Sequence, residues 1–223
     1  MTVFDLNTDS VRNLNQQLHE SPAASTAITN PCGRHCIACG IDADVDVSID
    51  GHVGYYCAGM NKQANVTITG NAGPGVAENI MSGSVRIEGN ASQYAGASGH
   101  GGTLIIHGDA SARCGISMKG VDIVVAGDVG HMAAFMAQKG RLVVCGDAGD
   151  SLGDSLYEAY LYVRGKAGAL GADCVEKEMT ADHVRDLAQL LESAGIDADA
   201  GAFRRYGSAR KLYNFNVDHA DDY

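Results

Sequence analysis

The sequence predicts an all-β fold, a single-stranded parallel β-helix of about seven 19-residue rungs, with an N-terminal arm and a C-terminal helical tail. Glycines recur every 19 residues, and branched aliphatic residues stand four and two positions before each of them. Glycine is abundant at 29 residues, whereas proline occurs three times and tryptophan never, which is typical of a chain with many tight turns. The recurring glycines are Gly51, Gly70, Gly89, Gly108, Gly127, Gly146 and Gly165.

The aliphatic pairs predict one short strand per rung. Two branched residues spaced two apart project to the same face of a strand, and branched side chains favour strand over helix. A 19-residue unit is also too short for a repeat of two helices, so we assign residues 45–174 to the solenoid. The pairs are Val47 and Ile49, Val66 and Ile68, Val85 and Ile87, Leu104 and Ile106, Ile123 and Val125, Leu142 and Val144, and Leu161 and Val163.

We expect the recurring glycines to form the corners of the rungs. A positive φ, or a close approach of two backbones, would exclude a side chain there. Small residues follow at two further positions of each rung and suit a narrow interior, ending with Ala167 and Ala172 in the last rung. The glycine-rich runs GNAGPG and GASGHGG lie on the same 19-residue grid, so we interpret them as structural and not as nucleotide-binding loops.

A polar ladder follows the corner glycines. If its members stack in register, Asp109, Asp128 and Asp147 stand about 5 Å apart and repel one another. Two explanations stay open: each carboxylate accepts backbone N–H bonds within its own turn, or the ladder faces a cation or a basic partner. The ladder consists of Asn71, Asn90, Asp109, Asp128, Asp147 and Lys166.

Residues 1–44 lack the repeat, and we expect them to form an arm or cap over the first rung. The arm contains Cys32, Cys36 and Cys39, with His35 between them. Closely spaced thiolates can hold an iron-sulfur cluster or zinc, so a metal-binding redox subunit is one alternative reading of this chain. Enzymes that use this spacing carry it in a domain of alternating strands and helices, which is missing here, and we therefore expect free cysteines and no metal.

Residues 175–223 predict a helix and a basic-aromatic tail. Thr180 is a plausible N-cap, Gly195 terminates the helix, and leucines between them form one apolar stripe. The segment after the helix is the chain's one basic patch, so it either docks onto a partner subunit or folds back onto the acidic column. The candidate docking residues are Phe203, Arg204, Arg205, Tyr206, Arg210, Lys211 and Tyr213.

Charge and composition exclude several classes of function. The net charge of −11 opposes broad contact with nucleic acid or an anionic membrane. The chain shows no apolar run long enough to span a bilayer, no secretory signal and no disulfide framework among its seven cysteines, so we expect a cytoplasmic protein. It also lacks a phosphate loop, a nucleophile elbow and a metal-binding helix, so we expect neither catalytic nor cofactor-binding residues in this chain.

Spaced glycines in the last rungs carry a resemblance to a known family. The GxxGxxxG run at Gly146, Gly149 and Gly153, with a related run starting at Gly165, resembles the C-terminal GXGXG domain of the glutamate synthase large subunit, a right-handed parallel β-helix. The resemblance covers residues 45–174 and extends weakly into NPCGRHCIACGID. The segments GYYCAGMN and FMAQKG are similar to corresponding rungs.

The resemblance implies a scaffold. In that family the β-helix holds two active sites at a fixed separation and carries no catalytic residue. Free-standing versions resemble the β-helix subunit of N-methylglutamate synthase, where a glutaminase or amidotransferase-like subunit and an FMN-binding, glutamate-synthase-like subunit are separate chains. FMN and an iron-sulfur cluster are then expected in a partner, and this chain is expected in a hetero-oligomer that transfers ammonia or methylamine.

Two alternatives accompany that reading. The related chain of formylmethanofuran dehydrogenase is a second relative implied by the resemblance. An autonomous β-helix enzyme acting on polysaccharide is disfavoured, because sugars stack on aromatic rings and only 6% of the residues are aromatic.

Overall fold

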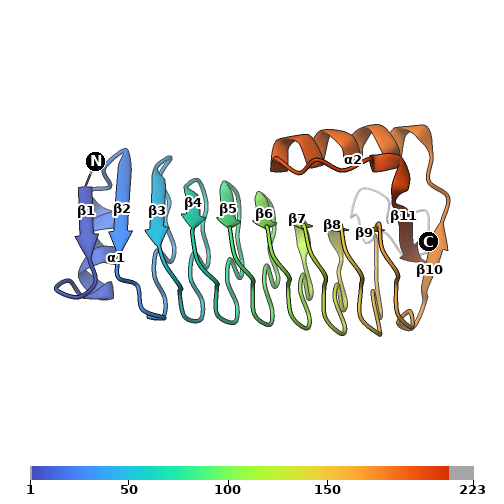
Figure 1. Cartoon of the computed structure of the whole chain (residues 1–223), viewed down its shortest axis with the longest axis horizontal. Helices are drawn as coiled ribbons and strands as arrows, with labels where there is room; N and C mark the ends of the chain where they lie inside the picture. Colours follow the sequence, from blue (N-terminus) through green and yellow to red (C-terminus); the bar gives the residue numbers. More distant parts are fainter. Residues whose placement is uncertain (1, 211–223) are drawn as a thin grey trace, which may run out of the picture.

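The computed structural model describes residues 2–210, which form one elongated column (Figure 1). Eleven strands make a single sheet in the order β1-β2-β3-β4-β5-β6-β7-β8-β9-β11-β10. The elements are β1 (Thr2–Asp5), α1 (Val11–Glu20), β2 (Ser25–Thr29), β3 (Asp46–Asp50), β4 (Asn65–Ile68), β5 (Ser84–Ile87), β6 (Thr103–Ile106), β7 (Lys119–Val125), β8 (Lys139–Val144), β9 (Tyr160–Val163), β10 (Cys174–Lys177), α2 (Ala181–Ala194), the 3-10 helix η1 (Ala200–Ala202) and β11 (Arg204–Ser208).

Strands β3 to β9 confirm the predicted parallel β-helix of 19-residue rungs. Each pairs in parallel with the next, and the paired residues lie 19 apart, as with Val47 and Val66. All fourteen predicted aliphatic residues are at most 2% exposed. A second column of parallel bridges, from Val53 to Ala167, closes the other side of the rungs. The apolar side chains therefore fill one continuous interior between the two columns.

Close approach of backbones explains the corner glycines after Gly51. A Cβ on Gly70 would lie 2.5 Å from the carbonyl carbon of Gly51, which real Cβ atoms do not tolerate. Only Gly51 among the seven has a left-handed φ, at 129°. Left-handed residues occur later in the rungs instead, as at Gly75, Ala77 and Asn79, where they turn the chain towards the next strand.

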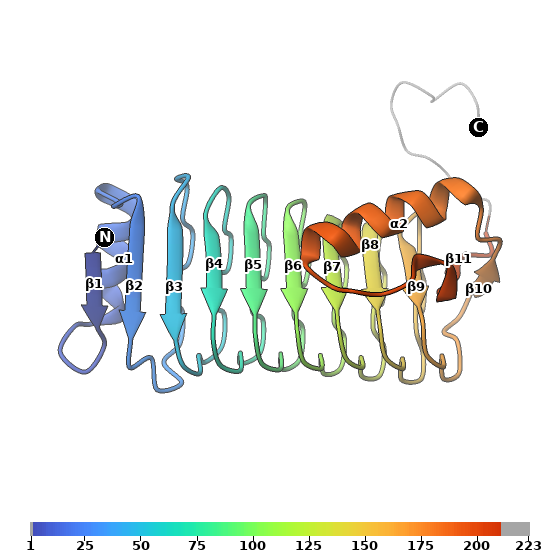
Figure 2. The same ribbon diagram turned by 45° about the horizontal axis from the view of Figure 1, so that its top comes forward.

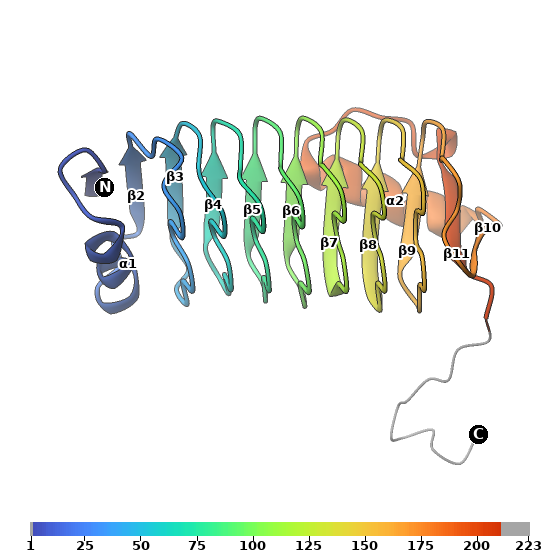
Figure 3. The ribbon, with the colours of Figure 1, turned by 90° about the horizontal axis from the view of Figure 1, so that it is seen from below.

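The N-terminal arm extends the sheet and then caps it. Strand β2 pairs in parallel with β3, so the ladder continues on the N-terminal side of residue 45. Backbone bonds such as Cys36 N–H to Tyr55 O join the arm to the first predicted rung. Helix α1, N-capped by the Ser10 hydroxyl, buries Leu14 and Leu18 and closes this end of the column (Figure 3).

Helix α2 has the predicted ends, with Thr180 as N-cap and Gly195 as left-handed C-cap. It lies along the outer face of β6 to β9 (Figures 1 and 2), where its leucines form a separate apolar cluster with side chains such as Val124 and Tyr162. At its C-terminal end, Arg86 of β5 donates a hydrogen bond to the Ala194 carbonyl (3.1 Å), a favourable place for a cation.

The last rung is one residue shorter than the others. Leu152 pairs with Leu170, 18 residues on, and Ala172, expected in the interior, is exposed. The chain then forms β10, runs through α2 and returns as β11, which is antiparallel to both β9 and β10 and lies between them. The tail thus completes the C-terminal end of the sheet.

Candidate functional site

The cysteine loop of the arm is held by helix α1. The Asn15 side chain donates to the Cys36 carbonyl (2.7 Å) and accepts from the Ala38 N–H (2.9 Å), and a ring nitrogen of His19 lies 2.7 Å from the Cys39 carbonyl oxygen. Cys32 is exposed, whereas Cys36 and Cys39 are half-buried. The loop is therefore fixed by its backbone, without help from its thiols.

Buried thiols in this region favour the protonated form. Burial raises the pKa of Cys39 to about 12, and the Cys39 thiol donates a hydrogen bond to the Tyr56 carbonyl (2.8 Å). The pKa of the neighbouring Cys57 is also raised by burial. Within residues 2–210, no three metal-ligating side chains stand together in a way that could hold an ion. Because metals bind the thiolate, this geometry disfavours the metalloprotein alternative.

The polar ladder is bonded from rung to rung. Oδ1 of each Asn or Asp accepts a hydrogen bond, 2.7 or 2.8 Å long, from the backbone N–H of the ladder residue one rung further on. The expected bond within the residue's own turn is thus wrong, because the acceptor reaches the next rung. Asp109, Asp128 and Asp147 remain exposed, and their Oδ1 atoms serve the column itself.

The basic-aromatic tail folds back onto the column. Phe203 and Tyr206 are 3% and 2% exposed, so these two candidate docking residues lie in the fold's interior and offer little surface to a partner. Arg204 donates to the Gly165 carbonyl (2.9 Å). Sequence reasoning treated the aromatic residues as surface because it had no sign that β11 enters the sheet. The remaining candidates Lys211 and Tyr213 lie outside the described residues.

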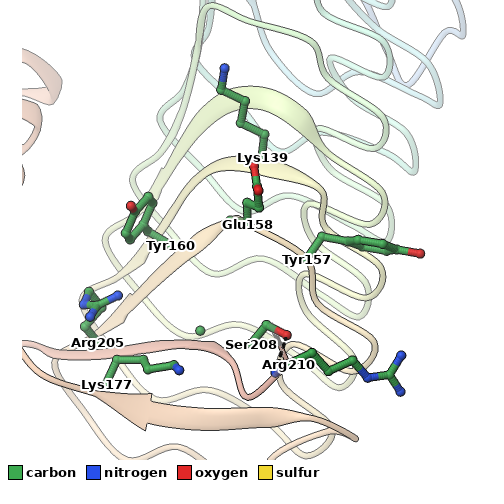
Figure 4. Close-up of a pocket in the computed structure, with 10 residues that line it drawn as sticks. Lys139, Tyr157, Glu158, Tyr160, Lys177, Arg205, Ser208 and Arg210 are labelled. Atoms are coloured by element: carbon green, nitrogen blue, oxygen red, sulfur yellow. Dashed lines mark hydrogen bonds between the residues drawn. The ribbon is translucent and has the colours of Figure 1, made fainter. Parts of the chain in front are cut away.

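Two tail arginines line an open hollow of about 550 Å³ at the C-terminal end of the sheet (Figure 4). We call it the basic hollow. Its cations come from four segments: Lys139 begins β8, Lys177 ends β10, Arg205 belongs to β11 and Arg210 follows that strand. Glu158 is the one carboxylate among the lining residues.

Aromatic rings and partial pairing shape the hollow. Tyr157 and Tyr160 are 45% and 42% exposed, and the Arg205 guanidinium lies 5.6 Å from the Tyr160 ring centroid. Arg205 also donates to the Glu178 carbonyl (2.8 Å), and Arg210 pairs with Asp173. Neither lysine of the hollow forms an ion pair with another residue of the range 2–210.

The lysines of the hollow carried a signal that sequence reasoning missed. Lys139, Glu158 and Lys177 are spaced 19 residues apart, so they continue the repeat and stack at one edge. Arg205 and Arg210 gave no such signal, because they reach the hollow on the returning strand.

Comparisons with known proteins give one full-length relative. The chain is 60% identical over 228 residues to "Protein GlxC" of Rhizobium meliloti (strain 1021), and the match covers all of both chains. No family model matches the chain. No helix of the described residues has the length and apolar character that crossing a membrane requires.

A solved structure shares the fold. A chain of the formyltransferase/hydrolase complex FhcABCD from Methylorubrum extorquens, determined with methylofuran, aligns with a TM-score of 0.55 at 23% identity. The alignment covers 83% of this chain and 74% of that one.

Proposed function

The chain belongs to the family of protein GlxC, and from that premise we propose that it is a non-catalytic structural subunit of an FMN-dependent, glutamate-synthase-like complex. It holds an amidotransferase-like subunit against an FMN-binding subunit, so that ammonia or methylamine passes between their active sites. The FMN and an iron-sulfur cluster belong to the partner. The complex is N-methylglutamate synthase, and it works in the cytoplasm.

The uninterrupted register of the column is the observation that carries this proposal. Every rung from β3 to β9 is joined by backbone hydrogen bonds to the rungs beside it. A solenoid of this kind transmits a fixed length, since each rung contacts only its neighbours. Holding two active sites at one separation limits the escape of a small intermediate, and this requires rigidity of the subunit between them. The GXGXG-like glycine spacing supports the same assignment.

Purification of the tagged full chain from its native cells tests the proposal. We expect a glutaminase-like chain and a yellow, FMN-containing chain to elute with it, identified by mass and by visible absorbance. Recovery of the protein alone would contradict the scaffold role. An absorbance band arising from this chain by itself would instead support the metal-binding alternative at the cysteine loop.

The likeness in fold to a chain of FhcABCD favours a second candidate, a structural chain similar to the related one of formylmethanofuran dehydrogenase. The same purification separates the two candidates. Partners that carry formyl groups, recovered without a flavin chain, would select the second.

A further inference from the structure

We propose that the basic hollow binds an acidic peptide segment of a partner subunit. This inference rests on the proposed function for the existence of a partner, and the hollow identifies where that partner docks and by what chemistry. The docking surface then consists of side chains from β8, β10 and β11, together with the turn before β9.

Charge is the first reason. The chain as a whole carries −11, yet the hollow brings four cations and one carboxylate together, a local excess of three positive charges. Like charges gathered at one edge repel one another, and a bound anion relieves that repulsion. Arg210 is partly neutralised by Asp173, and Arg205 is held by the Glu178 carbonyl and the Tyr160 ring. Lys139 and Lys177 therefore remain as the principal charges for an incoming carboxylate.

Shape is the second reason. The hollow is open, and its cations lie on separate segments around it (Figure 4), so it suits an extended chain with several carboxylates better than one small ion enclosed on all sides. The half-exposed rings of Tyr157 and Tyr160 add apolar contact area for the backbone and side-chain stems of such a peptide.

The strand edge beside the hollow is the third reason. Strand β10 ends the sheet and pairs only with β11 among the described strands. Its other edge offers backbone N–H and C=O groups to an added strand, and Lys177 stands at the end of that edge. An acidic segment laid along β10 would satisfy the backbone groups and the lysine together.

Binding of a fluorescein-labelled oligo-glutamate peptide to the purified full chain tests the proposal. We expect saturable binding that weakens as salt is raised, because exposed charges are screened within about 8 Å at physiological ionic strength. Lys139→Gln/Lys177→Gln, which keeps the length of both side chains, should weaken the affinity about tenfold through the loss of two exposed charge contacts. The matched control, Lys62→Gln/Lys166→Gln, removes the same charge elsewhere and should bind as the parent does.

Three results would overturn the assignment. Equal losses in the two double variants would mean that the peptide senses only net charge. Stronger competition by inorganic pyrophosphate than by unlabelled peptide would assign the hollow to a small anion. Binding that appears only after residues 211–223 are removed would assign it to the chain's own C-terminal segment.

This measurement does not depend on the identity of the complex. Partner recovery with a flavin chain but no peptide binding would leave the scaffold role standing and refute the docking site. Peptide binding without recovery of a glutamate-synthase-like partner would do the reverse.

Discussion

At the scale of residues, the corner glycine and the ladder residue of the preceding rung depend on one another. A Cβ on Gly127 would lie 2.1 Å from Asp109 Oδ1, the oxygen that accepts the Asp128 N–H. The same arrangement holds at Gly108 with Asn90 and at Gly146 with Asp128. A glycine is thus required because the side chain of the rung before it occupies the space.

We expect Gly127→Ala to lower the free energy of unfolding by about 1–3 kcal/mol, the usual cost of overpacking. The new methyl group displaces the Asp109 carboxylate and also meets the Gly108 carbonyl oxygen at 2.8 Å. Urea denaturation measures the change. Gly201→Ala is the control, since its Cβ would approach nothing closer than 3.3 Å. Equal stability of the two variants would refute the steric explanation.

The ladder predicts opposite outcomes for two substitutions of Asp128. Its Oδ1 accepts the Asp147 N–H at 2.7 Å. Asp128→Asn keeps this acceptor and removes a charge between two others, so stability should stay equal or rise, most clearly at low salt. Asp128→Ala removes the acceptor and should cost about 1 kcal/mol. Thermal melts at low and high salt separate these cases, and a destabilised Asn variant would mean that the negative charge itself is needed.

Buried thiols predict a loss of stability at alkaline pH. Burial raises the pKa of Cys39 and of Cys114 to about 12, whereas an unfolded cysteine ionises at about 8.5. Above that pH the unfolded state binds fewer protons than the folded state, so the free energy of unfolding falls as pH rises towards 12. Denaturation between pH 7 and pH 12 should show this fall, and Cys114→Ala should make it shallower. An unchanged slope in the variant would assign the alkaline loss to other groups.

At the scale of elements, the sequence predicted what repeats and what has caps. The strands from β3 to β9 followed from paired aliphatic residues on a fixed grid, and α2 from an N-cap, a leucine stripe and a terminal glycine. The arm was harder, because β2 pairs with β3 at an offset of 21 residues and so leaves the grid. Strand β11, RRYGS, lacks regular apolar alternation and pairs antiparallel with β9, more than 40 residues earlier at Arg204 and Val163.

Helix α2 should detach without unfolding the column. Its apolar cluster lies on the outer face of the sheet and is separate from the interior cluster of the rungs. Leu187 is fully buried in it, so Leu187→Ala should destabilise the helix by about 2–5 kcal/mol. Hydrogen exchange should then speed up in residues 181–194 and stay slow in β3 to β5. Gln189→Ala, on the exposed side of α2, is the control, and faster exchange throughout the column would show that the two clusters unfold together.

At the scale of the whole molecule, the two ends of the column differ. The N-terminal end is closed by α1 with apolar side chains, whereas the C-terminal end is closed by the returning strand β11 and presents the basic hollow. Removal of residues 196–223 would therefore take a strand out of the sheet, together with the buried Phe203 and Tyr206. Tail function is better tested by a chain that ends after Arg210, which keeps every described element.

The length of the column is itself testable, because one rung can be added in register. Duplicating residues 71–89 inserts a complete 19-residue unit and lengthens the column by about 4.8 Å. The second copy keeps Arg86 beside the C-terminal end of α2, so we expect a folded protein whose melting temperature stays close to that of the parent. If the column fixes the separation of two partner subunits, the longer variant should bind either partner alone but lose the coupled activity of the assembled complex. Coupled turnover at the parental rate would mean that the partners touch each other directly and that the rungs between them set no distance.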